Sequence, residues 1–266
     1  MDDIFKRVVA LDVETTGLNP SLGDRICQIA LVRIEGDEIT DKFVSLVNPE
    51  RDIPVAVSII HGIKNEDVRD APVFKEIADK VASFIENEIL IIHNAPFDIS
   101  FLKVEFQKSG VKFPDAKLVD TLQMARRFLN LPSNSLRNLA SYFNIQFETL
   151  HDAENDAIVA YRVFCNIWNL ISGKINLEEI IQDANKVGFV EPEEILPPEL
   201  LKAMKEGEII SVRYINRNGD VSIKKILPKE VISEYNNFYL KVFSYEKNRE
   251  INLRLDRILE IVENIE

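Results

Sequence analysis

The sequence of 266 residues is poor in glycine and cysteine, and both shortages exclude classes of function. Its nine glycines never take the G-x-G-x-x-G or Walker A spacing, which excludes a dinucleotide-binding loop and a P-loop. With two cysteines, three histidines and no H-E-x-x-H segment, a structural zinc site is not expected. Cys27 and Cys165 lie far apart in the chain, which argues against a disulfide framework and favours a reducing, cytoplasmic setting.

Long apolar runs are missing as well. No stretch approaches the roughly 20 residues that a membrane helix needs. The first residues lack the basic start and apolar core of a signal peptide. Hydrophobic residues make up 46% of the chain and charged residues 29%, which is a globular composition. We therefore expect a folded protein without a membrane segment.

Acidic residues outnumber basic ones, 44 to 32, and give a net charge of −12. This charge disfavours a general nucleic-acid coat protein, because phosphate backbones attract basic proteins. It is compatible with an enzyme that binds phosphates through bound cations, since a metal ion inverts the local charge. The excess of acid belongs to residues 1–200, whereas residues 201–266 are close to neutral.

The apolar pattern predicts a mixed α/β domain over residues 1–171. Three strands come first, over residues 7–13, 26–34 and 39–47, and a further short strand follows at 89–92. This order predicts an antiparallel meander that is extended by parallel strands and covered by helices on its faces.

Helical periodicity and capping residues indicate where helices begin and end. We expect helices over four ranges, 74–84, 96–107, 135–143 and 153–170. Gly110 is a plausible stop for the second, and Ser135 and Asp152 are suitable N-caps for the last two. Residues 118–124 fit either a short strand or a helix start.

A composition shift predicts a linker and a second domain after the first. Residues 172–205 combine a short predicted helix at 177–184 with a stretch rich in proline and glutamate, and we interpret them as a linker. Over residues 206–266 the pattern changes to short strands, and Asn218-Gly219 is a strong hairpin signal. We therefore predict a small β domain at this end.

Two acidic side chains, Asp12 and Glu14, come at the end of the first predicted strand. Alternation along a strand places residues i and i+2 on the same face. Neighbouring carboxylates in an apolar setting repel each other and are costly to desolvate, and a divalent cation relieves both costs. Oxygen-only ligands favour Mg²⁺ or Mn²⁺. Taken alone, the pair is equally compatible with a solvated strand end.

Two further acids and a histidine also lie at element ends. Asp98 follows the strand at 89–92, and Asp156 lies in the first turn of the helix after Asp152. Either acid can be an ordinary carboxylate favoured by a helix dipole. His151 precedes the same helix, and histidine can act as a base near neutral pH. Four acids with one histidine suit a site in which two divalent ions clamp both oxygens of a phosphoryl displacement.

Three segments resemble the motifs of the DEDDh exonuclease family, which includes the epsilon proofreading subunit of bacterial DNA polymerase III and RNase T. The segments are V-A-L-D-V-E-T-T-G-L (9–18), H-N-A-P-F-D (93–98) and H-D-A-E-N-D-A (151–157). Their order and spacing resemble the family over residues 5 to 170. The resemblance implies an RNase H-like fold and two Mg²⁺ or Mn²⁺ ions.

The same resemblance implies roles for single residues. The implied metal ligands are Asp12, Glu14, Asp98 and Asp156. His151 would be the general base of a hydrolysis that releases nucleoside 5′-monophosphates from 3′ ends. Thr15 would approach the terminal 3′-hydroxyl, and Leu18 would wedge against the last base. His61 in I-I-H-G-I would line the substrate cleft, with an ordinary turn histidine as the alternative.

Residues 204–262 resemble a WYL domain, a small SH3-like barrel that in bacteria senses ligands or binds nucleic acid. The resemblance rests on N-N-F-Y-L (236–240) and R-L-D-R-I (254–258). Phe238 replaces the family's tryptophan, and Ile251 stands where an arginine is often found. The candidate contacts are Tyr239, Arg249, Arg254 and Arg257. An aromatic ring beside arginine can bind single strands, whereas a core ring with solvated arginines is the alternative.

These patterns favour a metal-dependent 3′–5′ exonuclease that acts on DNA, on single-stranded 3′ ends, in proofreading or repair. Its partners would be nucleic-acid 3′ ends and a DNA polymerase or repair complex. The first alternative is an exoribonuclease of the RNase T kind, because the 2′-hydroxyl is discriminated by shape around the last nucleotide. The second is a nucleic-acid-sensing regulatory protein that uses the WYL-like domain and an inactive nuclease scaffold.

Overall fold

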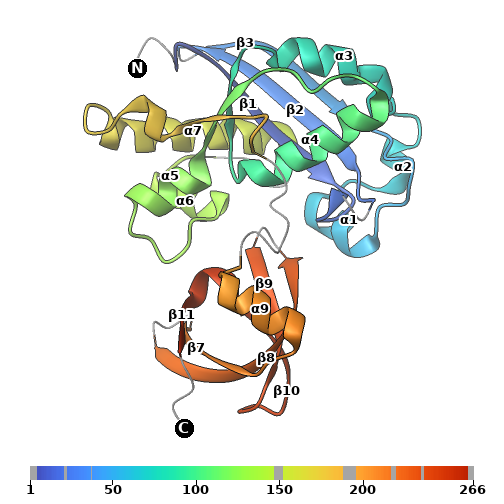
Figure 1. The fold of residues 1–266 in the computed structure, drawn as a ribbon. Coiled ribbons are helices and arrows are strands. Elements are labelled where there is room, and N and C mark those ends of the chain that lie inside the picture. The colour runs from blue at the N-terminus through green and yellow to red at the C-terminus, as the bar shows by residue number, and fades with distance from the viewer. Residues whose placement is uncertain are drawn as a thin grey trace. The chain divides into compact units, whose positions relative to one another are not determined.

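The computed structural model describes residues 5–20, 23–36, 38–146, 152–187, 196–216, 220–234 and 237–262. The chain divides into two compact units, Met1–Phe189 and Val190–Glu266. Figure 1 colours the first from blue to yellow and the second from orange to red. Within the described ranges, no helix is long and apolar enough to cross a membrane.

A six-stranded mixed sheet forms the centre of the first unit, in the order β3-β2-β1-β4-β5-β6. Its strands are β1 (Arg7–Thr15), β2 (Ile26–Glu35), β3 (Glu38–Leu46), β4 (Ile89–Ile92), β5 (Lys117–Asp120) and β6 (Ile181–Asp183). The first three pair antiparallel, β4 runs parallel to β1, and β5 runs parallel to β4. The predicted meander with a parallel extension is therefore confirmed.

Helices cover both faces of this sheet. They are α1 (Val55–His61), α2 (Asn65–Val68), α3 (Phe74–Ile85), α4 (Ala95–Ser109), α5 (Thr121–Phe128), α6 (Leu136–Tyr142) and α7 (Ala153–Ile171). The sequence did not predict α1 and α2. Ser135 caps α6 as expected, since its side chain accepts a hydrogen bond from the N–H of Asn138. Gly110 ends α4 at a φ of 77°, a left-handed conformation that glycine adopts without strain.

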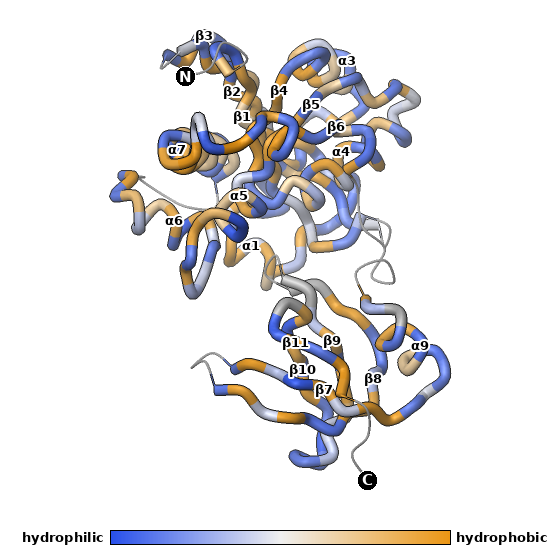
Figure 2. Tube along the Cα trace, turned by 60° about the vertical axis from the view of Figure 1, so that its left-hand side comes forward, coloured by the Kyte–Doolittle hydropathy of each residue, from blue (hydrophilic) through white to orange (hydrophobic). Residues whose placement is uncertain are grey.

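The alternation of β1 sorts its side chains between two apolar layers. Val9 and Leu11 join a core with α3 and α4, whereas Val8 and Ala10 join a second core with α5, α6 and α7. Figure 2 shows α4 and α7 on opposite sides of the sheet, with the tube of the inner strands mostly orange. Because even positions face α7, the same alternation directs Asp12 toward that helix.

Residues 177–184 differ from the predicted helix. Leu177–Glu179 forms one 3-10 turn, and β6 follows it and pairs antiparallel with β5. Lys103 on α4 also donates a hydrogen bond to the carbonyl of Asn185 at 2.9 Å. This part of the segment expected as a linker, 172–205, therefore belongs to the first unit. The helix prediction was wrong because the apolar residues have a helical i, i+3, i+4, i+7 spacing, but pairing of residues 181–183 with the edge strand β5 prevails over this local pattern.

The second unit contains α9 (Pro198–Glu206) and an antiparallel sheet in the order β10-β9-β8-β7-β11. Its strands are β7 (Ile210–Ile215), β8 (Val221–Glu234), β9 (Asn237–Ser244), β10 (Arg249–Arg254) and β11 (Ile258–Val262), with the 3-10 turn η4 (Leu255–Arg257) before the last. Val212, Ile226, Leu240 and Leu200 form its core. Over the described strands, no ladder joins β10 to β11, so the observed sheet is open rather than a closed barrel. The predicted Asn218-Gly219 turn lies outside the described residues.

Candidate active site

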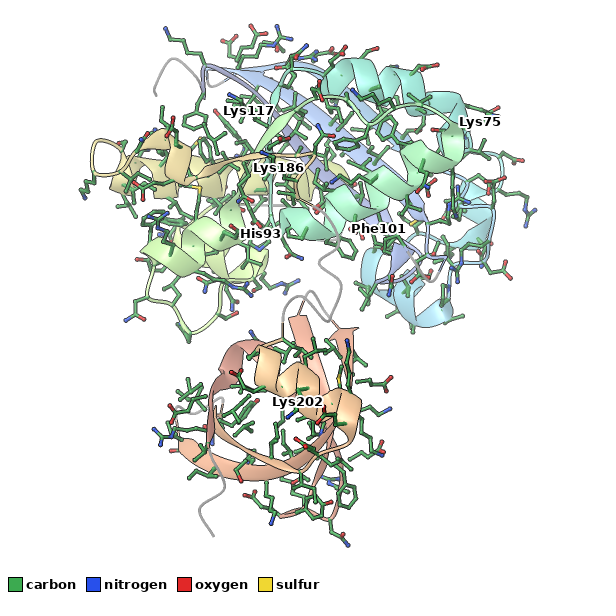
Figure 3. The ribbon with its side chains drawn as sticks, in the orientation of Figure 1. Lys75, His93, Phe101, Lys117, Lys186 and Lys202 are labelled. Atoms are coloured by element: carbon green, nitrogen blue, oxygen red, sulfur yellow. The ribbon has the colours of Figure 1, made fainter. Side chains whose placement is uncertain are left out.

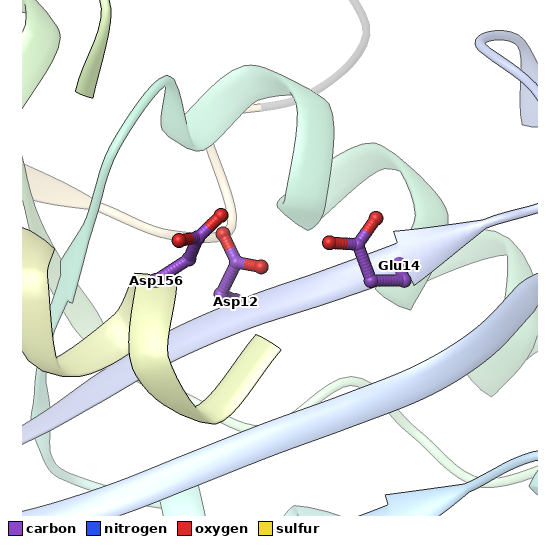
Figure 4. Close-up of side chains that lie close together, drawn as sticks. All are labelled: Asp12, Glu14 and Asp156. Atoms are coloured by element: carbon purple, nitrogen blue, oxygen red, sulfur yellow. The ribbon is translucent and has the colours of Figure 1, made fainter. Parts of the chain in front are cut away.

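Three carboxylates from two elements meet beside β1. Asp12, Glu14 and Asp156 each offer an oxygen atom, and these atoms lie within 4.8 Å of one another. Figure 4 shows Asp12 and Asp156 facing each other, with Glu14 further along β1 on the same side. Asp156 comes from the first turn of α7, the helix toward which the even positions of β1 point. The structure thus brings together three of the four acids that the sequence predicts.

Asp98, the fourth acid, reaches the same strand from the first turn of α4. Its side chain is 2% exposed, and its Oδ1 accepts a hydrogen bond from the backbone N–H of Val13 at 3.1 Å. Val13 stands between the two acids of β1. The charge of Asp98 also helps to raise the pKa of Asp12, so Asp98 belongs to the same acidic centre.

Burial and mutual repulsion raise the pKa values of the acids in this centre. Burial, followed by repulsion from Asp98 and Glu14, raises the pKa of Asp12 well above its usual value. Burial, followed by repulsion from Asp156 and Asp152, raises the pKa of Glu14 to about 8. Burial likewise raises the pKa of Asp98 well above its usual range. Such a group of carboxylates needs a counter-charge near neutral pH, and its oxygen-only donor set fits a divalent cation such as Mg²⁺ or Mn²⁺.

A residue of β2, Gln28, holds the start of α7. Asp152 is the N-cap residue of α7, as predicted, but its side chain makes no capping hydrogen bond to the helix backbone. Its Oδ1 instead accepts a hydrogen bond from Nε2 of Gln28, and Oε1 of Gln28 accepts one from the N–H of Ala153, both at 3.1 Å. Gln28 is the register partner of Glu14. No local sequence signal could reveal this contact, since it spans 125 residues. His151 lies outside the described residues.

The loop after β1 holds Thr15 and Leu18. Thr15 is 5% exposed, and its hydroxyl donates a hydrogen bond to the carbonyl of Gly17 at 2.5 Å. The carboxylate of Asp24 folds back over Gly17 and accepts a hydrogen bond from the N–H of Asn19 at 3.0 Å. Leu18 is half-buried in this loop, directly after the acidic strand.

The side chain of His61 is directed into the interior of the protein. It is 9% exposed, its Nδ1 accepts a hydrogen bond from the N–H of Ile63 at 3.0 Å, and its Nε2 lies 3.9 Å from Sγ of Cys27. Burial raises the pKa of Cys27 to about 12, so this thiol stays protonated. The neighbours Ile59 and Ile60 on α1 are 78% and 44% exposed. The surface near His61 is therefore apolar.

The structure brings together some of the four candidate residues of the second unit and separates Arg249 from them. Tyr239 and Arg254 are register partners across β9 and β10, and Arg257 follows in η4. Arg249 pairs with Ser244 at the other end of the same two strands. Its odd offset from Arg254 places it on the opposite face. Tyr239 and Arg254 are therefore brought side by side, whereas Arg249 is not.

Two family models match this chain. The family model described as Exonuclease matches residues 9–164, more than half of the chain. The chain belongs to the exonuclease family. A second model, described as WYL domain, matches residues 197–263 of this exonuclease. Both resemblances predicted from the sequence are confirmed.

Two curated relatives match the nuclease part. The exonuclease is 34% identical over 163 residues to the 3′-5′ exonuclease DinG of Bacillus subtilis (strain 168), a match that covers 61% of this chain and only 18% of the relative. It is 40% identical over 165 residues to the DNA polymerase III subunit epsilon of Rickettsia prowazekii (strain Madrid E), covering 59% of this chain and 72% of the relative.

A solved structure shares the fold of the first unit. The nuclease domain of 3′hExo, a DEDDh family member bound to rAMP, superposes with a TM-score of 0.54 at 19% identity. The match covers 65% of this exonuclease and 96% of that domain. At this identity the likeness shows the fold alone, and the acids described above supply the link to chemistry. DEDDh exonucleases are hydrolases that use divalent metal ions.

Proposed function

We propose that the protein removes nucleoside 5′-monophosphates one at a time from the 3′ ends of single-stranded DNA. The observation that carries this proposal is the group of carboxylate oxygens of Asp12, Glu14 and Asp156 within 4.8 Å, with Asp98 tied to the same strand. The relative named DNA polymerase III subunit epsilon supports DNA as the substrate and a polymerase or repair complex as the partner.

In this proposal, the four acids bind two Mg²⁺ or Mn²⁺ ions. When bound, such ions lower the pKa of a water molecule and stabilise the leaving 3′-oxygen. Asp98 is fixed by the N–H of Val13, which keeps its carboxylate in place without an ion. His151 accepts the proton of the attacking water as general base. The two hydrogen bonds from the Gln28 side chain to Asp152 and Ala153 hold the chain directly after His151 in a defined position.

The apolar surface beside this centre favours binding of unpaired bases. Thr15 is placed to approach the terminal 3′-hydroxyl, and Leu18 to wedge against the last base. His61 would line the substrate cleft; its Nδ1 accepts a hydrogen bond from the N–H of Ile63, and the neighbouring Ile60 is exposed. An exposed apolar surface favours single strands, because only unstacked bases offer their faces to side chains.

The second unit would guide the strand or sense it. Tyr239 and Arg254, side by side on β9 and β10, can combine base stacking with phosphate attraction, and Arg257 extends the positive charge. Arg249 would contribute separately from the other face.

RNA is the alternative substrate, and the likeness to a nuclease domain bound to rAMP supports it. Discrimination between the two sugars depends on the shape around the last nucleotide. A purely regulatory protein with an inactive scaffold is disfavoured, because all four acids are present and converge.

Digestion of 5′-labelled DNA and RNA strands of one sequence tests the proposal. With Mg²⁺ we expect a ladder of products shortened from the 3′ end, faster on DNA, and none with EDTA. Asp12→Asn and Asp156→Asn should abolish the ladder, whereas Asp41→Asn, at an exposed acid of β3, should not. A ladder with Asp12→Asn, or none with the wild type, would overturn the proposal.

A further inference from the structure

Another buried carboxylate, that of Asp120, joins the starts of two helices. It ends β5 and is 2% exposed. Its Oδ1 accepts hydrogen bonds from the backbone N–H groups of Leu122 at 2.9 Å and Gln123 at 3.3 Å, in the first turn of α5. The same oxygen accepts one from the N–H of Asn94 at 3.1 Å, at the start of α4. One atom thus binds two segments that are 26 residues apart.

The parallel pairing of β4 and β5 explains this arrangement. Ile92 and Asp120 are register partners, so the two strands end side by side and each leads directly into a helix. Both helix starts therefore direct N–H groups toward one place. A carboxylate at that place satisfies donors that a helix start leaves free and interacts favourably with both helix dipoles.

A second contact ties the same two segments. Nδ1 of His93, labelled in Figure 3 at the end of β4, lies 2.9 Å from the hydroxyl of Thr121 on α5. Burial, followed by the nearby charge of Arg126, lowers the pKa of His93 to about 4, so this ring is neutral. His93 therefore acts at the junction as a neutral hydrogen-bonding group and not as a proton carrier.

The junction leads to the metal centre through α4. Asn94 is the N-cap of α4 and has a φ of 72°, a left-handed conformation that costs energy in a residue other than glycine. Asp98 follows within the first turn of the helix. A small change in the backbone at Asn94 would therefore move the carboxylate of Asp98 relative to Val13.

We propose that Asp120 is a positioning residue, which holds the start of α4 so that Asp98 reaches the metal centre. The inference rests on the proposed function, in which Asp98 is a metal ligand. The rival assignment makes Asp120 itself a ligand or a charge needed by the site. The two assignments differ in what matters at this position, the place of one acceptor oxygen or the negative charge.

Two substitutions separate these assignments. Asp120→Asn keeps an acceptor oxygen at the same place and removes the charge. Asp120→Glu keeps the charge and displaces the oxygen by one methylene. The measurement is Mn²⁺ affinity of the full chain, by calorimetric titration, together with kcat and KM on a labelled strand. Circular dichroism confirms that each variant is folded.

We expect the Mn²⁺ affinity of Asp120→Asn to lie within about twofold of the wild-type value. The affinity of Asp120→Glu should be about tenfold lower, which is the order of loss seen when a residue that orients a metal ligand is removed. Ser135→Ala, which removes an N-cap remote from the junction, should leave the affinity unchanged. The kcat of Asp120→Glu should fall more than its KM changes, since Asp98 contacts the ions rather than the bases.

The reverse order of affinities, with Asn weak and Glu close to wild type, would overturn the inference in favour of a ligand. Equal affinities for both variants and the wild type would overturn it as well. Failure of the proposed function has a different signature, in which the wild type binds Mn²⁺ but cuts no nucleic acid. Because the affinity is measured without substrate, it tests Asp120 in either case.

Discussion

Asp98 accepts a hydrogen bond from the backbone N–H of Val13 at 3.1 Å, although 85 residues separate the two in the chain. Val13 lies between Asp12 and Glu14, so this bond ties the acid of α4 to the strand that carries two others. The fold thereby sets the distance between carboxylates before any cation arrives. A site arranged in this way saves the cost of ordering its ligands when the metal binds.

The metal-free protein should lose stability as the pH rises. Glu14 has a pKa of about 8 in the folded chain against an ordinary value of 4.5, so the folded state binds more protons between these values. The free energy of unfolding therefore falls as the pH rises through this range, and the raised pKa of Asp12 acts in the same direction. Thermal unfolding with EDTA measures the slope. Excess Mg²⁺ should flatten it, and a melting temperature that rises with pH in EDTA would refute the prediction.

Gly17→Ala should impair catalysis through the loop after β1. A Cβ at this position would lie 2.3 Å from Oδ2 of Asp24, so the carboxylate must leave the N–H of Asn19. We expect kcat/KM to fall by about tenfold to a hundredfold, because Thr15 and Leu18 shift. Gly36→Ala is the control, since its φ of 65° strains alanine without any clash. Equal kcat/KM values for the two variants would show that the loop does not position substrate.

Glu105→Ala should destabilise the fold strongly. Both carboxylate oxygens of Glu105 accept hydrogen bonds from Arg25, at 2.7 and 2.8 Å, and Glu105 is 2% exposed. Its removal leaves a largely buried guanidinium without its main partner, which costs about 3–5 kcal/mol in the free energy of unfolding. Glu50→Ala removes the exposed partner of Arg25 and should cost less than about 1 kcal/mol. Denaturant titration measures the free energy of unfolding of both variants. Similar costs for the two would show that Glu105 is not the main partner of Arg25.

Tyr239→Ala should weaken binding of single strands by the full chain, since this ring lies beside Arg254. Loss of one stacked base costs about 1–3 kcal/mol, which is roughly a fivefold to hundredfold change in the dissociation constant. Arg249→Ala, at the far end of the same strands, should have a smaller effect. Fluorescence anisotropy with a labelled strand and EDTA measures both. A larger loss with Arg249→Ala would place the contact on the other face.

The local sequence pattern was sufficient to predict the acidic strand and several helix ends. The i, i+2 spacing of Asp12 and Glu14 defines a shared face whatever the rest of the chain does. Gly110 and Ser135 act through their own backbone neighbourhood, so their roles as a stop and a cap were also predictable.

Contacts between distant segments were not predictable in the same way. Gln28 caps α7 from β2, and Asp120 joins α4 to α5, yet neither residue has a distinctive neighbour in the sequence. β6 exists because β5 offers it an open edge, a tertiary cause that no window around residues 181–183 contains. The two residues of the WYL-like segment that meet, Tyr239 and Arg254, became apparent only from the strand register.

Anomalous diffraction from a crystal soaked in manganese tests the central claim most directly, because it locates the ions without reference to activity. We predict density at about 2.1 Å from carboxylate oxygens of Asp12 and Asp156, with Glu14 and Asp98 completing the ligand set. The peaks should disappear in the Asp12→Asn variant. Manganese bound only elsewhere, or an unchanged peak in that variant, would contradict the account.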